Sequence, residues 1–137
     1  MRDYEGECWT QDEGAAKKYR LNHIPSAGSA GLAERGSGVI HQGSNSGYQA
    51  IGLAYGVFDA DVILLLGYDM QRTGGKRHWF GDHPEPMNVD SPLADFVKRY
   101  ATIKTDDVEI INCSRETALT CFPRMTIEDA IAKYDLR

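Results

Sequence analysis

The sequence has no long hydrophobic run, and its longest aliphatic stretch is the short segment Val62 to Leu66. A helix needs roughly 20 consecutive apolar residues to cross a bilayer, so no membrane-spanning helix is predicted. The amino end, Met1 to Gly14, is acidic and polar, without the basic segment and apolar core of a secretory signal. We therefore expect a cytoplasmic protein with no membrane partner.

Cysteine is scarce. The three cysteines, Cys8, Cys113 and Cys121, are odd in number and lack the CxxC spacing of a zinc site. Reduced thiols are the simplest interpretation, although Cys113 and Cys121 could form a disulfide in an oxidising compartment. We predict no metal site and no bound cofactor.

Basic residues are in deficit, with 15 Lys and Arg against 20 Asp and Glu and a formal net charge of -5. Binding along a nucleic-acid backbone needs clustered Lys and Arg, so a broad nucleic-acid interface is excluded. A compact anionic ligand held at a local site is compatible with this charge balance. With 137 residues, the chain has room for one domain.

The common phosphate-binding motifs are absent. The sequence contains neither the GxGxxG dinucleotide fingerprint nor the glycine spacing and lysine of a Walker A loop. Kinases, nucleoside triphosphatases and nicotinamide enzymes are therefore not expected. The segment GSNSG, from Gly43 to Gly47, also lacks the nucleophile-elbow pattern, so neither Ser44 nor Ser46 is predicted to be a nucleophile.

The segment from Gly43 to Met70 predicts a small-residue turn, an amphipathic helix and a buried strand, which together form half of a nucleotide-binding unit. Ser46 followed three residues later by Gln49 is a capping-box pattern. Apolar residues then recur at the spacing of a helix packed on a sheet: Ile51, Ala54, Tyr55 and Phe58. Residues 61–66 lack polar alternation, which is typical of a parallel strand covered on both faces.

The rest of the chain continues this alternation. We predict short strands at 38–41 and 108–112, and helices at 92–101 and directly after Thr126. Residues 1–37 are weakly patterned and predict a loop-rich lead-in, with a short helix around 15–19, to a core of 38–137. The expected fold is a single α/β domain, with a three-layer, mainly parallel sheet flanked by helices, Rossmann-like and truncated at the amino end.

Ligands of open parallel sheets bind beyond the carboxyl ends of the strands. In the predicted fold, three loops share this rim: 42–47, 67–88 and 112–122. The first loop opens a helix whose free N–H groups and positive dipole end suit a phosphate or carboxylate. We therefore predict these ligand-binding residues there: Ser44, Asn45, Ser46 and Gly47. The alternative is a plain strand-to-helix turn with a good cap.

The second loop concentrates residues with useful chemistry. Asp69 follows the strand directly, and the segment HWFGDHP contains two histidines and two aromatic residues. We predict Asp69, His78 and His83 as catalytic, since histidine serves as general acid or base near neutral pH. Gln71 and Trp79 are predicted to bind ligand, with Trp79 stacking on a base or sugar ring.

Simpler interpretations of this loop stay open. Asp69 could cap the turn that follows the strand, and Trp79 and Phe80 could pin the loop to the core, leaving both histidines at the surface. A metal site built from His78, Asp82 and His83 is conceivable, but the spacing matches no strong zinc signature.

The sequence also resembles a known group of proteins. The stretches SGYQAIGLAYGVFDADVILLLGYDM, HWFGDHP and VEIINCSRETALTCFPRMTIEDAI, with WTQD and LNHI ahead of them, resemble the carboxyl-terminal half of an α/β family of bacteriophage and prophage proteins. This family is distantly similar to family 42 sialyltransferases and to motility accessory factors that glycosylate flagellin. The resemblance implies that Asn45, Ser46 and Gly47 touch a nucleotide phosphate or sugar, and that His78 or His83 acts as base.

One departure shapes the expected function. The transferases begin with a strand and a glycine-bearing loop that this sequence does not show, so part of the nucleotide pocket is expected to be missing. We predict a protein that binds a nucleotide, nucleotide-sugar or related phosphorylated small molecule, as a glycosyltransferase-like or nucleotide-processing enzyme. The alternative is a non-enzymatic phage protein, acting in the host cytoplasm, that sequesters a nucleotide signal or blocks a host partner. A homo-oligomer is expected, because neighbouring copies could complete the pocket.

Overall fold

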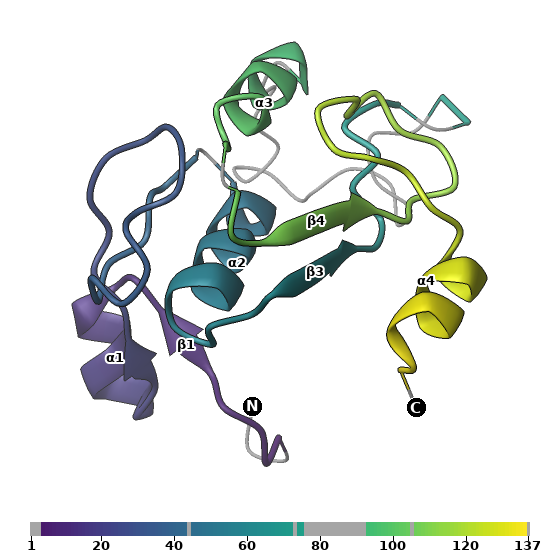
Figure 1. Ribbon diagram of the computed structural model, residues 1–137. Coiled ribbons are helices and arrows are strands. Elements are labelled where there is room, and N and C mark those ends of the chain that lie inside the picture. The colour runs from purple at the N-terminus through teal and green to yellow at the C-terminus, as the bar shows by residue number, and fades with distance from the viewer. Residues whose placement is uncertain (1–3, 44, 73, 76–92, 105, 137) are drawn as a thin grey trace.

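The structure is a computed structural model that describes residues 4–43, 45–72, 74–75, 93–104 and 106–136. Its elements run in the order β1 (Trp9–Thr10), α1 (Glu13–Tyr19), β2 (Asn22–His23), α2 (Ser46–Gly56), β3 (Val62–Leu65), α3 (Leu93–Tyr100), β4 (Glu109–Asn112) and α4 (Ile127–Tyr134) (Figure 1). From α2 onward, this order confirms the predicted alternation of helices and strands.

The strands form two short parallel sheets. β1 pairs with β2, and β3 pairs with β4 in a register that runs from Val62 opposite Glu109 to Leu65 opposite Asn112. Within the described ranges, the chain is therefore a small mixed α/β domain with four helices and two two-stranded sheets. The α/β class and the parallel pairing are confirmed, but the described residues do not form one continuous sheet.

The segment 38–41, predicted as a strand, pairs outside both sheets. Ile40 forms an isolated parallel bridge with Ser26, through backbone hydrogen bonds of 2.9 and 3.0 Å. Its buried side chain packs on α2, where a Cβ atom on Gly52 would lie 3.4 Å from it. The segment thus bonds to the chain that follows β2 and adds no strand to the β3–β4 sheet.

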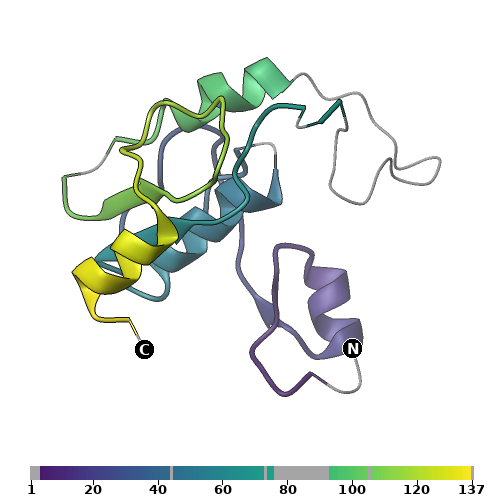
Figure 2. The same cartoon turned by 90° about the vertical axis from the view of Figure 1, so that its right-hand side faces the viewer.

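Residues 9–23 contain regular structure that interrupts the expected lead-in. β1, α1 and β2 form a small parallel β-α-β unit beside α2 (Figure 2). Asp12 caps α1, since its Oδ1 accepts a hydrogen bond from Ala15 N at 2.8 Å. The short helix predicted around 15–19 is confirmed. The strands escaped prediction because two residues are too few to show a period.

The start of α2 corrects the predicted capping box. Asn45 is the N-cap: its backbone is extended, with φ -156° and ψ 159°, and its Oδ1 accepts a hydrogen bond from Tyr48 N at 2.9 Å. Ser46 is instead the first residue of the helix. Gln49 does not take part in the cap, because its Nε2 donates to Gln42 O at 3.2 Å.

One face of β3 is buried and the other is partly open. Ile63 and Leu65 belong to the main core, where they join residues from α2, α3 and the chain around β4: Tyr48, Ile51, Tyr55, Tyr100 and Phe122. Leu64 points to the other face and packs against a smaller cluster that includes Ala130 of α4. Leu66, just after β3, is 60% exposed. The prediction of a strand covered on both faces is therefore wrong at its carboxyl end.

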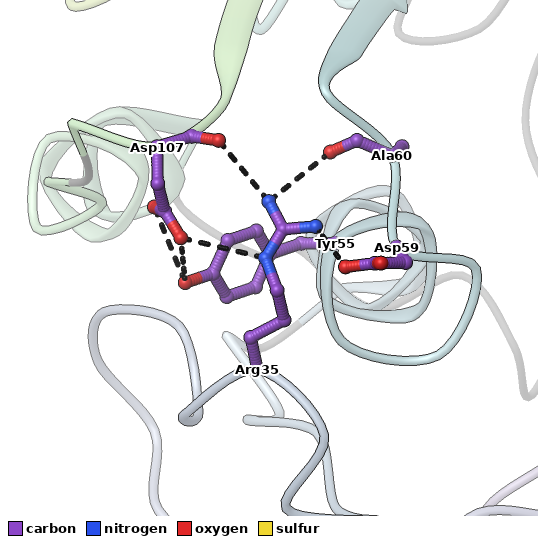
Figure 3. A network of polar contacts seen from close by, with 5 residues as sticks. All are labelled: Arg35, Tyr55, Asp59, Ala60 and Asp107. Carbon is purple, nitrogen blue, oxygen red and sulfur yellow. Dashed lines mark hydrogen bonds and ion pairs between the residues drawn. The ribbon is translucent and has the colours of Figure 1, made fainter.

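Arg35 connects chain segments at the opposite end of the β3–β4 sheet, where both strands begin. Arg35 forms ion pairs with Asp59 and Asp107, and its Nη2 donates to Asp107 O at 3.1 Å (Figure 3). The guanidinium also lies 4.5 Å from the ring centroid of Tyr55, whose hydroxyl donates to Asp107 at 3.1 Å. Arg35 therefore ties the segment before α2 to the turns that precede β3 and β4, which is a structural role.

The described helices are short. The longest of them, α2, has 11 residues, and none in the described ranges is long and apolar enough to cross a bilayer. All three cysteines carry free thiols, with Cys113 buried and Cys121 exposed. The disulfide that the sequence left open between Cys113 and Cys121 is not formed.

Candidate binding cleft at helix α2

A cleft of about 410 Å³, the α2 cleft, lies between the β1–β2 unit and helix α2. Its lining comes from β1 and the residue after it, from the chain between β2 and α2, and from one face of α2: Trp9, Thr10, Gln11, Ile24, Ile40, Ser46, Gln49, Ala50 and Leu53. The volume falls within the roughly 300 to 1,000 Å³ typical of small-molecule sites.

The amino end of α2 opens into this cleft. Ser46, the first residue of the helix, is exposed and lines the cleft. In the first turn of a helix the backbone N–H groups lack intrahelical acceptors, and the positive end of the helix dipole lies there. The side chain of Asn45 already uses the N–H of Tyr48. The cap therefore leaves the N–H groups of Ser46 and Gly47 unused among the described residues, and of these two residues Ser46 lines the cleft.

Trp9 supplies the aromatic wall of the cleft. Its ring meets that of Phe58 edge to face, with centroids 5.8 Å apart and an interplanar angle of 87°. Its Nε1 donates to Glu7 Oε2 at 3.1 Å. These contacts hold the indole at the cleft, where apolar residues continue the wall: Ile24, Ile40 and Leu53. The cleft thus has a polar end at the start of α2 and an aromatic and aliphatic wall.

Tyrosines fix the turn that leads into α2. Tyr100 Oη donates to Asn45 Oδ1 at 2.8 Å, and Tyr68 Oη donates to Gly47 O at 2.9 Å. A Cβ atom on Gly47 would lie 2.9 Å from Tyr100 Oη and 3.1 Å from the ring of Tyr68. Close packing by the two tyrosines therefore accounts for glycine at this position. Within the described residues, the buried Nδ2 of Asn45 has no hydrogen-bond partner.

The tyrosine packing predicts a loss of stability in alkaline solution. Burial raises the pKa of Tyr48, Tyr68 and Tyr100 above the ordinary value of 10.0. The folded chain favours the neutral phenols, so their contribution is fully present below pH 10 and is lost as pH rises toward the folded-state pKa values. We expect the free energy of unfolding, measured by urea titration, to fall steadily above pH 10.

The variant Tyr100→Phe serves as control for this prediction. It removes one of the shifted groups while keeping the ring, so the fall in stability above pH 10 should become less steep than in the unmodified chain. Equal slopes for the two proteins would contradict the assignment of the effect to the buried tyrosines.

Asp69 lies in a different cleft, at the carboxyl ends of β3 and β4. This carboxyl-edge cleft has a volume of about 460 Å³ and is lined by Leu66, Gly67, Asp69, Cys113, Ser114, Arg115, Glu116 and Ile127. Among the described residues, the two clefts share no lining residue. Ser46 and Asp69, which the sequence predicts at one rim, therefore face separate clefts.

Hydrogen bonds tie together the chain segments that follow β3 and β4. Tyr68 N donates to Ser114 Oγ at 2.7 Å, and Thr117 Oγ1 donates to Tyr68 O at 2.7 Å. The fully buried Asn112 accepts from Ser114 N at 3.0 Å and donates to Thr117 Oγ1 at 3.1 Å. Since Tyr68 also bonds to Gly47, the described parts of the three predicted rim loops do meet. Their polar groups hold the loops in place.

Several predicted site residues lie outside the described residues: Ser44, His78, Trp79 and His83. Gln71 is described and half-buried, but it lines neither of the two clefts. Trp9 is among the cleft residues that the sequence did not predict as site residues. Its signals were a tryptophan in a polar, weakly patterned segment and its place in the stretch WTQD, and its position in the cleft depends on packing against Phe58.

Comparisons with protein family models, with curated proteins and with solved structures find no match. The fold and the cleft therefore define the protein only as a small mixed α/β domain with a candidate small-molecule site. In the part of the chain that is described, no three His, Cys, Asp or Glu side chains are arranged to hold a metal ion.

Proposed function

We propose that the α2 cleft binds a nucleotide, a nucleotide-sugar or a related phosphorylated small molecule, with a phosphate at the amino end of α2. The observation that carries the proposal is that Ser46, at the first helical position, opens into a cleft of suitable size that also contains Trp9. Free N–H groups at a helix start bind phosphate, and an indole ring stacks on a base or sugar.

The charge of the cleft limits how many phosphate groups a ligand can carry. None of its nine described lining residues is charged, so the backbone N–H groups of α2 and the helix dipole supply the attraction for an anion. Among its described lining residues, the cleft has no lysine or arginine to neutralise several phosphates. A ligand with one or two phosphate charges, such as a nucleoside monophosphate or a nucleotide-sugar, fits better than a nucleoside triphosphate.

The described geometry favours binding over turnover. Asp69, the predicted catalytic residue that the structure describes, lines the carboxyl-edge cleft and is absent from the lining of the α2 cleft. Sequestration of a nucleotide signal, the alternative function inferred from the sequence, needs a binding cleft alone. Recovery of unchanged ligand after denaturation supports sequestration, whereas a product whose formation stops in His78→Ala or His83→Ala supports the enzyme.

We expect a nucleoside monophosphate, with cytidine monophosphate as the probe, to stabilise the protein against thermal unfolding, and cytidine, which lacks the phosphate, to do so far less. A bound ligand at 100 times its dissociation constant adds about 2.7 kcal/mol to the free energy of unfolding. The variant Ser46→Pro tests the proposed contact. Asn45 is extended, and proline fits the first helical position after an extended residue. The substitution removes the N–H proposed to meet the phosphate, together with the serine hydroxyl.

Ser46→Pro should weaken binding of cytidine monophosphate by about tenfold or more, since a hydrogen bond to a charged group contributes about 1.5 to 3 kcal/mol. Glu13→Pro is the matched control, because Glu13 is the first residue of α1 and lies outside the lining of the α2 cleft. Equal binding by both variants would contradict the phosphate position. A nucleotide panel without any stabilising ligand would contradict the proposed function.

A further inference from the structure

One hydrogen-bonding edge of β3 pairs with β4, and within the described chain the other edge has no strand beside it. Among the described residues the sheet consists of β3 and β4 alone, and Figure 1 shows β3 at its border. Asp61 O and Leu65 O accept hydrogen bonds from β4 residues or their neighbours, each at 2.9 Å. Because alternate residues of a parallel strand bond to the same partner, three residues direct their backbone groups away from β4: Val62, Leu64 and Leu66.

Over the residues described, this outer edge carries no lysine, proline or bulge. Within the described chain, no backbone or side-chain group forms a hydrogen bond with the outward N–H and C=O groups of Val62, Leu64 or Leu66. Exposed sheet edges normally carry a lysine, a proline or a bulge that prevents pairing with another chain. The segment from Val62 to Leu66 is aliphatic throughout, and Leu66 is 60% exposed.

We propose that this edge pairs with the same edge of a second copy of the chain, antiparallel and around a two-fold axis at Leu64. In this register Leu64 exchanges both backbone hydrogen bonds with Leu64 of the second copy, and Val62 does so with its Leu66. The side chains of these residues lie on the α4 side of the sheet, so the exposed Leu66 of each copy is covered by Val62 of the other.

The composition of the edge favours a second copy over a different protein. An aliphatic edge without charges needs a partner strand that is equally apolar, and the antiparallel register matches each aliphatic residue with another. Asp61 then lies opposite Gly67, so like charges do not meet across the pair. Pairing also joins two two-stranded sheets into one of four strands, and two-stranded sheets are marginal alone.

Leu66→Lys tests the interface, with Leu136→Lys as matched control. Both replace an exposed leucine, 60% and 48% exposed, but Leu136 follows α4 and lies outside the proposed edge. Sedimentation equilibrium over a concentration series should give twice the mass of one chain for the unmodified protein and for Leu136→Lys. Leu66→Lys should lower the association constant by at least about tenfold, because lysine blocks edge pairing.

Amide hydrogen exchange supplies a second readout. The N–H groups of Leu64 and Leu66 should be protected in the unmodified protein and exchange in Leu66→Lys, whereas those of Ile63 and Leu65, which face β4, should be protected in both. Val62→Pro removes an outward N–H at the first residue of β3, where proline is tolerated, and should also give monomers. A monomeric unmodified protein, or equal dimerisation of Leu66→Lys and Leu136→Lys, would overturn the proposal.

Discussion

Replacing Tyr100 with alanine is expected to lower the free energy of unfolding by about 3 to 5 kcal/mol, the range for removing a large aromatic side chain from a core. The residue is fully buried, and its ring meets those of Tyr48, Tyr68 and Phe122 edge to face at centroid distances of 5.3, 6.0 and 6.4 Å. A small domain has only about 5 to 15 kcal/mol of stability in total, so this loss removes a large fraction of it.

The conservative variant Tyr100→Phe separates the two contributions of this residue. Phenylalanine keeps the ring contacts and loses the hydrogen bond to Asn45, which leaves the N-cap of α2 with its bond from Tyr48 N. The expected cost is about 0.5 to 1.5 kcal/mol. Urea titrations of both variants at neutral pH provide the comparison. Equal losses for alanine and phenylalanine would contradict a packing role for the ring.

Gly43→Ala is expected to have the second large effect, about 2 to 5 kcal/mol, because a side chain there is strained in two ways. The backbone of Gly43 is left-handed, with φ 53°, and an added Cβ atom would overlap the ring of Tyr48. The ring of Tyr48 cannot easily move aside, since it is fully buried and its hydroxyl donates to Gly31 O at 2.7 Å.

Gly38→Ala isolates the backbone contribution. Gly38 is also left-handed, with φ 73°, but nothing lies within 4 Å of a Cβ atom built on it. Its expected cost is the conformational cost alone, about 1 to 2 kcal/mol. The difference between the two variants in the midpoint of urea unfolding therefore measures the clash with Tyr48. If Gly38→Ala were as destabilising as Gly43→Ala, the clash would contribute nothing.

Local patterns predicted the elements whose stability depends on one amphipathic face. In α3, the spacing of Leu93, Phe96, Val97 and Tyr100 predicted the helix, and in α4 Thr126 caps the helix by accepting from Asp129 N at 3.1 Å, as its sequence suggested. Both signals lie within one or two helical turns. β3 was predicted from a different local signal, a short aliphatic run, and β4 lies within the predicted strand 108–112.

The cap of α2 is a feature that local sequence patterns do not predict. Asn45 and Ser46 are both good capping residues, so the sequence offers two adjacent starting points for the helix. Tyr100, 55 positions further along the chain, donates to the oxygen of Asn45 that accepts from Tyr48 N. A contact at that distance in sequence leaves no periodic signal, and it supports the cap at Asn45.

The sequence by itself determined the α/β class, the helices and strands from α2 onward, and the exposed start of α2 as a candidate phosphate site. Only the tertiary structure decided that Ile40 pairs with Ser26 instead of extending the β3–β4 sheet, and that Ser46 shares a cleft with Trp9 but not with Asp69. The physical reason is that helix periodicity and capping act between near neighbours. Strand pairing and cleft formation depend on which distant surfaces bury the most apolar area together.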